Sequence, residues 1–107
     1  MSGDVTAYLP LGIETFRISD AQLSASSEAD NSHSAACSRL NHHIRGGAWA
    51  PANSDRTEFL QIDLAWIVVL TGIAIQGHPE KSYRTLAFKI RYGISSDEET
   101  FKDYPKV

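Results

Sequence analysis

Alternation of apolar and polar residues is clearest in the second half of the chain. Between residues 58 and 64, the apolar residues Leu60, Ile62 and Leu64 alternate with polar ones. A period of two predicts a half-buried strand there. Residues 67–75 also alternate, but both sets of positions are largely apolar and many are β-branched, which favours a central strand over a helix. The Gln-Gly-His-Pro run at 76–79 ends this strand.

The same pattern predicts a strand over 86–94, a turn near 95–99 and an antiparallel return over 100–104. The first half of the chain predicts a short strand at 22–26 and one helical turn within 35–40, separated by a polar stretch. Short strands divided by turns indicate an all-β sandwich or barrel. Trp66, in a turn between strands, is expected to be partly buried. The expected core residues are Trp49, Leu60, Ile62, Leu64, Ile73, Ile75, Phe88, Ile90 and Tyr92.

Composition limits the classes of protein to consider. The 107 residues are enough for one domain, and 42% hydrophobic with 21% charged residues is sufficient for a buried core. The net charge of -3 argues against a nucleic-acid binder. No signal peptide is visible at the start, and the uncharged apolar run 64–75 is shorter than the roughly 20 residues of a membrane span. Cys37 is the single cysteine, so no intrachain disulfide can form, and we expect a buried thiol.

No catalytic constellation is recognisable. The sequence has no nucleophile elbow, phosphate loop or zinc motif, and Asp63 has no partner carboxylate or nucleophile at a telling spacing. A structural hydrogen-bonding role is expected for Asp63. The adjacent pair His42 and His43 lacks the further ligands that a metal site needs. We therefore expect neither an enzyme, nor a cofactor, nor a metal.

Six motifs in order resemble the discoidin domain, also called the coagulation factor V/VIII type C domain. The first runs from Pro10-Leu11-Gly12-Ile13-Glu14 into Arg17-Ile18-Ser19-Asp20-Ala21-Gln22-Leu23-Ser24-Ala25-Ser26-Ser27. The others are Ser38-Arg39-Leu40-Asn41, Gly47-Ala48-Trp49-Ala50-Pro51-Ala52, Phe59-Leu60-Gln61-Ile62-Asp63-Leu64, Leu70-Thr71-Gly72-Ile73-Ala74-Ile75-Gln76-Gly77 and Phe88-Lys89-Ile90-Arg91-Tyr92. Each motif is weak alone, but together they cover nearly the whole chain.

The resemblance implies a jelly-roll-like β-sandwich of the galactose-binding-domain type, with ligand recognition by loops at one end. Members of the family bind glycans, anionic phospholipids, collagen or proteins, commonly in adhesion, so we expect a non-catalytic binding module outside the cell or on its surface. A glycan or a cell-surface or matrix protein is the preferred ligand. The alternatives are an anionic membrane, an accessory module of a larger extracellular protein or enzyme, and a degenerate copy without binding activity.

Two departures from the family pattern affect this expectation. The cysteine that usually precedes the Pro10-Leu11-Gly12 motif is absent, and Trp49-Ala50-Pro51 stands where the family often has Trp-Cys-Pro. The family domain is also longer than this chain. We expect an N-terminal tail at 1–9 and, at 10–107, a discoidin-like domain that lacks its closing strands and is incomplete as a sandwich. Unpaired strand edges would then favour self-association.

Three loops are expected at the ligand-binding end: 28–34, 42–46 and 78–84. The first is polar and has no large apolar residue to insert into lipid, which weakens the membrane hypothesis. Arg45 and the neighbouring imidazoles suit hydroxyls and carboxylates, and Tyr83 can stack on a sugar or pack on the sheet rim. Plain solvated loops are the alternative. The candidate binding residues are Asp30, Asn31, His33, His42, His43, Arg45, His78, Tyr83 and Arg84.

Overall fold

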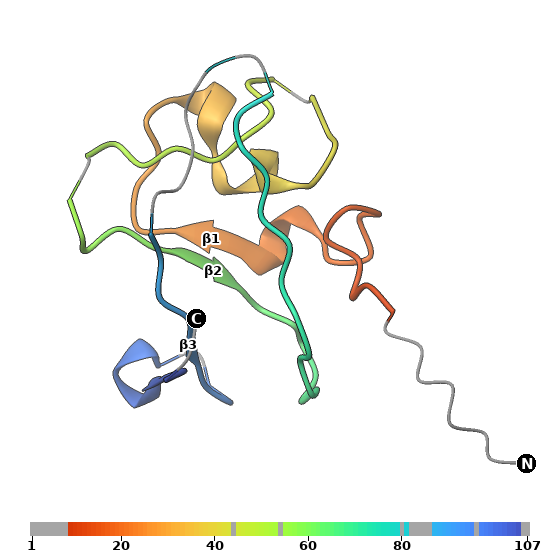
Figure 1. Ribbon diagram of the computed structural model, residues 1–107, viewed down its shortest axis with the longest axis vertical. Helices are drawn as coiled ribbons and strands as arrows, with labels where there is room; N and C mark the ends of the chain where they lie inside the picture. The colour runs from red at the N-terminus through yellow and green to blue at the C-terminus, as the bar shows by residue number, and fades with distance from the viewer. Residues whose placement is uncertain are drawn as a thin grey trace, which may run out of the picture.

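Two antiparallel ladders and four 3-10 turns make up the regular structure of the described residues (Figure 1). The computed structural model describes residues 9–43, 45–53, 55–79, 81, 87–95 and 97–105. The predicted tail at 1–9 therefore lies outside the described residues except for Leu9. The elements are η1 (Asp20–Gln22), β1 (Leu23–Ala25), η2 (Asn31–His33), η3 (Ala35–Ser38), β2 (Leu60–Ile62), β3 (Arg91–Tyr92), η4 (Glu98–Thr100) and β4 (Lys102–Asp103).

The first ladder pairs β1 with β2 in the register Leu23 with Ile62 and Ala25 with Leu60. Both strands were predicted, within longer ranges. The Gln22 side chain donates to the Asp63 carbonyl oxygen at 2.7 Å and accepts from the Ser19 amide at 3.0 Å, which fixes the start of β1 beside the end of β2. Asp63 Oδ1 accepts from the Ala65 amide at 2.8 Å. This contact confirms its structural role.

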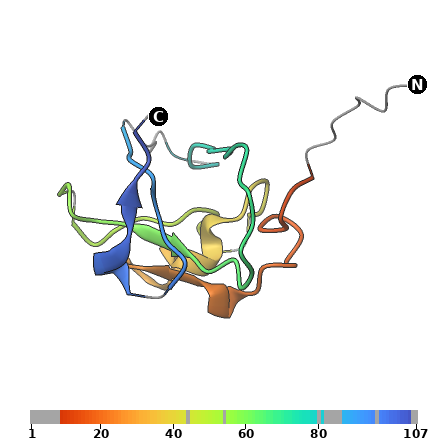
Figure 2. The same cartoon turned by 90° about the horizontal axis from the view of Figure 1, so that it is seen from below.

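The second ladder pairs β3 with β4 and has only two residue pairs. The tight return predicted after residue 94 is confirmed. The two ladders are separate sheets, and in Figure 2 the blue hairpin is upright while the β1–β2 ladder runs horizontally. The Tyr104 amide continues the pairing by donating to the Ile90 carbonyl oxygen at 2.8 Å. The strand predicted over 86–94 is thus reduced to its Arg91–Tyr92 part.

The core is small and lies between β1, η3 and the loop before η1. Ile18, Leu23 and Ala35 are buried, and the half-buried residues of β2 pack against them. Cys37 is a buried free thiol, as predicted. Of the expected core residues, Trp49, Leu60, Ile62, Leu64 and Ile90 are half-buried.

Several core predictions are wrong. No strand forms over 67–75, which crosses Figure 1 as an irregular extended trace. A strand needs a neighbouring backbone, and no described residue makes a backbone hydrogen bond with 66–75. Without that pairing the described residues form no second layer over the segment, and Trp66, predicted to be partly buried, is 82% exposed. The remaining core predictions that prove exposed are Ile73, Ile75, Phe88 and Tyr92.

Among the described residues, no helix is long and apolar enough to cross a membrane.

Candidate functional site

The first predicted loop, 28–34, uses most of its polar groups to hold itself in shape. The Asp30 carboxylate accepts from the Ser32 amide at 2.9 Å and from His33 Nδ1 at 2.8 Å, so it caps η2 and anchors the imidazole. The His33 hydrogen bond is the main cause that lowers the pKa of the Asp30 carboxyl. Glu28 accepts from the Ala35 amide at 2.7 Å. His33 is only 9% exposed, so it supports the loop from inside.

The second loop is attached directly to the first. The Gly46 amide donates to the Ser32 carbonyl oxygen at 2.8 Å, and Arg45 Nη1 donates to the Asn31 carbonyl oxygen at 2.9 Å. A Cβ at Gly46 would lie 2.5 Å from the same Ser32 oxygen and 2.7 Å from His33 Nε2. Only glycine therefore permits this close approach of the two loops.

The third loop reaches the first through a pair of histidines. His33 Nε2 and His78 Nε2 lie 3.2 Å apart, and His78 Nδ1 accepts from the Lys81 amide at 3.0 Å. These partners assign the tautomers: each neutral ring receives one hydrogen bond and donates the other, ending at Asp30. The first two predicted loops and the described residues 78, 79 and 81 of the third thus meet at one end of the molecule, at the top of Figure 1.

A hollow of about 220 Å³ lies between the second and third loops. Its polar walls are cross-linked, because Asn41 and Gln76 exchange two hydrogen bonds of 2.8 and 2.9 Å. Glu14 lies in a fourth loop, residues 12–18. Its carboxylate accepts from Asn41 Nδ2 at 3.0 Å, and its carbonyl oxygen pairs with His42 Nε2 at 2.7 Å. The hollow is lined by Asn41, His42, His43, Gly47, Gln76, Gly77 and Pro79.

The nine predicted binding residues fall into four groups. Asp30, Asn31, His43 and Arg45 are exposed at the loop end, and His42 and His78 are half-buried there. His33 is buried beneath them, while Tyr83 and Arg84 lie outside the described residues. Sequence reasoning missed Glu14, Asn41 and Gln76. All three lie in family-like motifs, but nothing in those motifs marks them as site residues, because only the tertiary fold brings them together.

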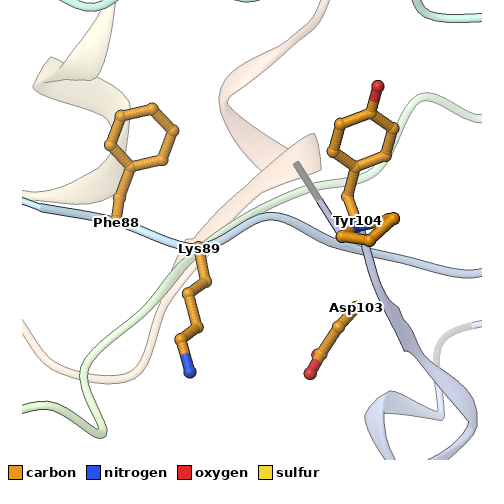
Figure 3. A pocket seen from close by; sticks show the side chains of 5 residues that line it. Phe88, Lys89, Asp103 and Tyr104 are labelled. Atoms are coloured by element: carbon orange, nitrogen blue, oxygen red, sulfur yellow. The ribbon is translucent and has the colours of Figure 1, made fainter. Parts of the chain in front are cut away.

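A second hollow, of about 370 Å³, lies on the β3–β4 hairpin and is bordered by Phe88, Lys89, Asp103, Tyr104 and Pro105. Figure 3 shows the Phe88 and Tyr104 rings on one side of the chain and the Lys89 and Asp103 side chains on the other. Asp103 is already paired with Arg91 Nε at 3.1 Å. Although this hollow is larger, its polar groups do not converge, so the cross-linked loop end is the better candidate.

Comparison with known proteins identifies the family. The sequence profile of the F5/8 type C domain matches residues 22–107. Neuropilin-1a of Danio rerio is 38% identical over 104 residues, covering 91% of this chain and 11% of the relative. Coagulation factor VIII of Sus scrofa is 36% identical over 94 residues, covering 85% of this chain and 4% of the relative. The chain thus spans about a tenth or less of these relatives, and it belongs to the F5/8 type C, or discoidin, family, whose domain is a β-sandwich binding module.

Proposed function

We propose that this domain binds a polar ligand, a glycan or the polar surface of a protein, through the loop end formed by 28–34, 42–46 and the start of 78–84. The observation that carries the proposal is the direct bonding of the three loops, above all Gly46 to Ser32 and His33 to His78. Loops fixed in this way lose little freedom on binding, which favours affinity. Asn31, His43 and Arg45 stay exposed on this scaffold as donors and acceptors.

The chemistry of the first loop favours a polar ligand over a lipid bilayer. Its residues are small, polar or acidic, and Glu28 and Asp30 carry negative charge. A bilayer contact needs apolar side chains to insert and gains nothing from carboxylates near anionic headgroups. Among the described residues, no group of three or more metal-ligating side chains is gathered that could bridge the carboxylates to phosphate.

The family match and the small share of each relative that this chain covers support a further part of the proposal. We infer that residues 10–107 act as one recognition module of a larger protein, located outside the cell or at its surface. The module itself carries out no chemistry, and its role is attachment or adhesion.

A binding screen with a charge-matched control tests the proposed function. The chain is applied to a glycan array and to anionic phosphatidylserine liposomes, in parallel with Arg45→Asn and Arg56→Asn. Asparagine tolerates the left-handed backbone that Arg45 adopts, with φ of 54°. Both variants lose one positive charge, but Arg56 lies outside the loop end. We expect glycan binding that Arg45→Asn weakens and Arg56→Asn does not. Binding to liposomes with no binding to any glycan would overturn the sugar form of the proposal, and equal loss in both variants would remove the loop end as its site.

A further inference from the structure

Phe16 occupies a backbone conformation that bulky residues avoid. The loop from Gly12 to Ile18 is closed by a hydrogen bond of 3.0 Å from the Ile18 amide to the Gly12 carbonyl oxygen. Within it Phe16 has φ of 66°, in the left-handed region where glycine and asparagine are common and aromatic residues are rare. Nothing in the burial of the side chain explains this cost, because Phe16 is 47% exposed. Such strain at an exposed side chain points to a role in recognition.

Two side chains hold the Phe16 ring in place. The Arg39 guanidinium carbon lies 4.1 Å from the ring centroid, and the His42 ring meets it edge-on with centroids 5.0 Å apart at 85°. Arg39 is itself immobilised, since its side chain is fully buried and pairs with Asp20 Oδ1 at 2.7 Å. A cation and an aromatic edge therefore fix the orientation of the ring while almost half of the residue stays in contact with solvent.

The His42 ring connects the Phe16 ring to the polar hollow between the second and third loops. His42 contacts the Phe16 ring and also lines the hollow, and Glu14, two residues before Phe16, bonds both Asn41 and His42. An aromatic surface therefore adjoins amide and imidazole groups. Each primary amide of Asn41 and Gln76 has a second N–H beyond the bonds already described, which leaves donors for a ligand.

We propose that Phe16 is the stacking surface of a pyranose subsite, with the C–H face of the sugar on the ring and its hydroxyls at Asn41, His43 and Gln76. A pyranose fits because it presents an apolar face and a polar rim, the same two chemistries that lie side by side here. The inference rests on the proposed function and deepens it, since it names the sugar class and an additional contact residue.

Solution NMR with simple sugars tests this subsite. The chain is titrated with the methyl pyranosides of glucose, galactose and mannose, alongside Phe16→Leu and Phe59→Leu. Phe59 is the matched control, being 41% exposed on β2's flank with an ordinary backbone. We expect upfield shifts of sugar C–H protons above the aromatic ring. Phe16→Leu abolishes these shifts and weakens binding at least about tenfold, and Phe59→Leu changes neither.

The outcomes separate the inference from the function on which it rests. If Phe16→Leu binds as the parent does, the inference fails while the proposed function stands. If the parent binds no pyranoside but binds other array ligands in an Arg45-dependent manner, the inference again fails alone. If the parent binds nothing, both fail. A Phe16→Asn variant, which relieves the backbone strain, controls for folding: with its Tm close to that of the parent, loss of sugar binding reports the missing ring.

Discussion

His33 and His78 meet nitrogen to nitrogen, with 3.2 Å between their Nε2 atoms, although 45 positions separate them in the sequence. Their ring centroids lie 5.4 Å apart. This contact joins the first loop to the third and so places the exposed donors of the loop end on one scaffold. The hydrogen-bond chain runs in one direction, from the Lys81 amide through His78 and His33 to Asp30.

Removal of the His78 imidazole should uncouple the first and third loops. His78→Ala deletes both the nitrogen that meets His33 Nε2 and the acceptor of the Lys81 amide. In this variant we expect faster hydrogen exchange at the Lys81 amide and altered ring nitrogen shifts of His33.

A His78→Gln variant provides the matched control. Its amide offers a donor and an acceptor in place of the two ring nitrogens. We expect it to keep the link between the loops and the exchange rate of the Lys81 amide, both of which change in His78→Ala. Equal Lys81 exchange in His78→Ala and in the parent protein would contradict the prediction.

Asp30 should stabilise the fold above its pKa and cease to do so in acid. The hydrogen bond from His33 is the largest cause that lowers the Asp30 pKa below its ordinary 3.8. A carboxylate with a depressed folded pKa contributes stability that is present above the unfolded pKa and is lost as the pH falls through the folded pKa. Replacing Asp30 by Asn should therefore lower the Tm at pH 7 and flatten the decline of Tm below about pH 4.

Asp55→Asn is the matched comparison for Asp30→Asn. The pKa of Asp55 is also lowered, but by Thr57, its neighbour two positions along the chain. Both variants should flatten the decline of Tm in acid. Only Asp30→Asn should also change the NMR shifts of backbone amides in the second and third loops. Confinement of the amide changes of Asp30→Asn to residues 28–34 would show that its carboxylate does not support the loop end.

The alternation of apolar and polar residues predicted those strands that have a neighbouring strand to pair with. β1 and β2 formed within the predicted ranges because the pairing of Leu23 with Ile62 buries apolar side chains against Ala35. The segment 67–75 has the stronger β pattern but forms no strand. Periodicity reports which face of a segment can be buried, and the burial itself depends on a neighbouring strand that local sequence does not encode.

The candidate site was predictable in position but not in its connections. The family-like motifs correctly placed the loops 28–34 and 42–46 together. They did not reveal that His33 is buried as a support, because a histidine in a polar stretch looks like a surface residue. The sequence does not mark Phe16 for a related reason: its backbone angle, its exposure and its contact with Arg39 all follow from the tertiary fold.

Arg39 should be a major contributor to stability. Its buried guanidinium donates to the carbonyl oxygens of Ile13 and Ile18 at 2.5 and 2.8 Å and pairs with Asp20, tying the fourth loop to η3. Hydrogen bonds to charged groups contribute about 1.5–3 kcal/mol, so Arg39→Met should lower the free energy of unfolding by roughly this amount. Urea denaturation measures it. Arg56→Met, at an exposed position, should change stability little, and comparable losses in the two variants would contradict a specific role of Arg39.

The exposed apolar segment 66–75 should drive self-association. Val69 is 90% exposed, and no described residue pairs with its backbone. A long apolar segment with an unpaired backbone can add to a second chain edge to edge. Val69→Lys places a charge there and should shift sedimentation-velocity profiles toward the monomer at high protein concentration. Thr71→Lys adds the same charge to the same segment without removing an apolar side chain, so it should have the smaller effect. A parent chain that stays monomeric over the whole concentration range would contradict the prediction. If both variants dissociate equally, the added charge and not the loss of an apolar contact is the cause.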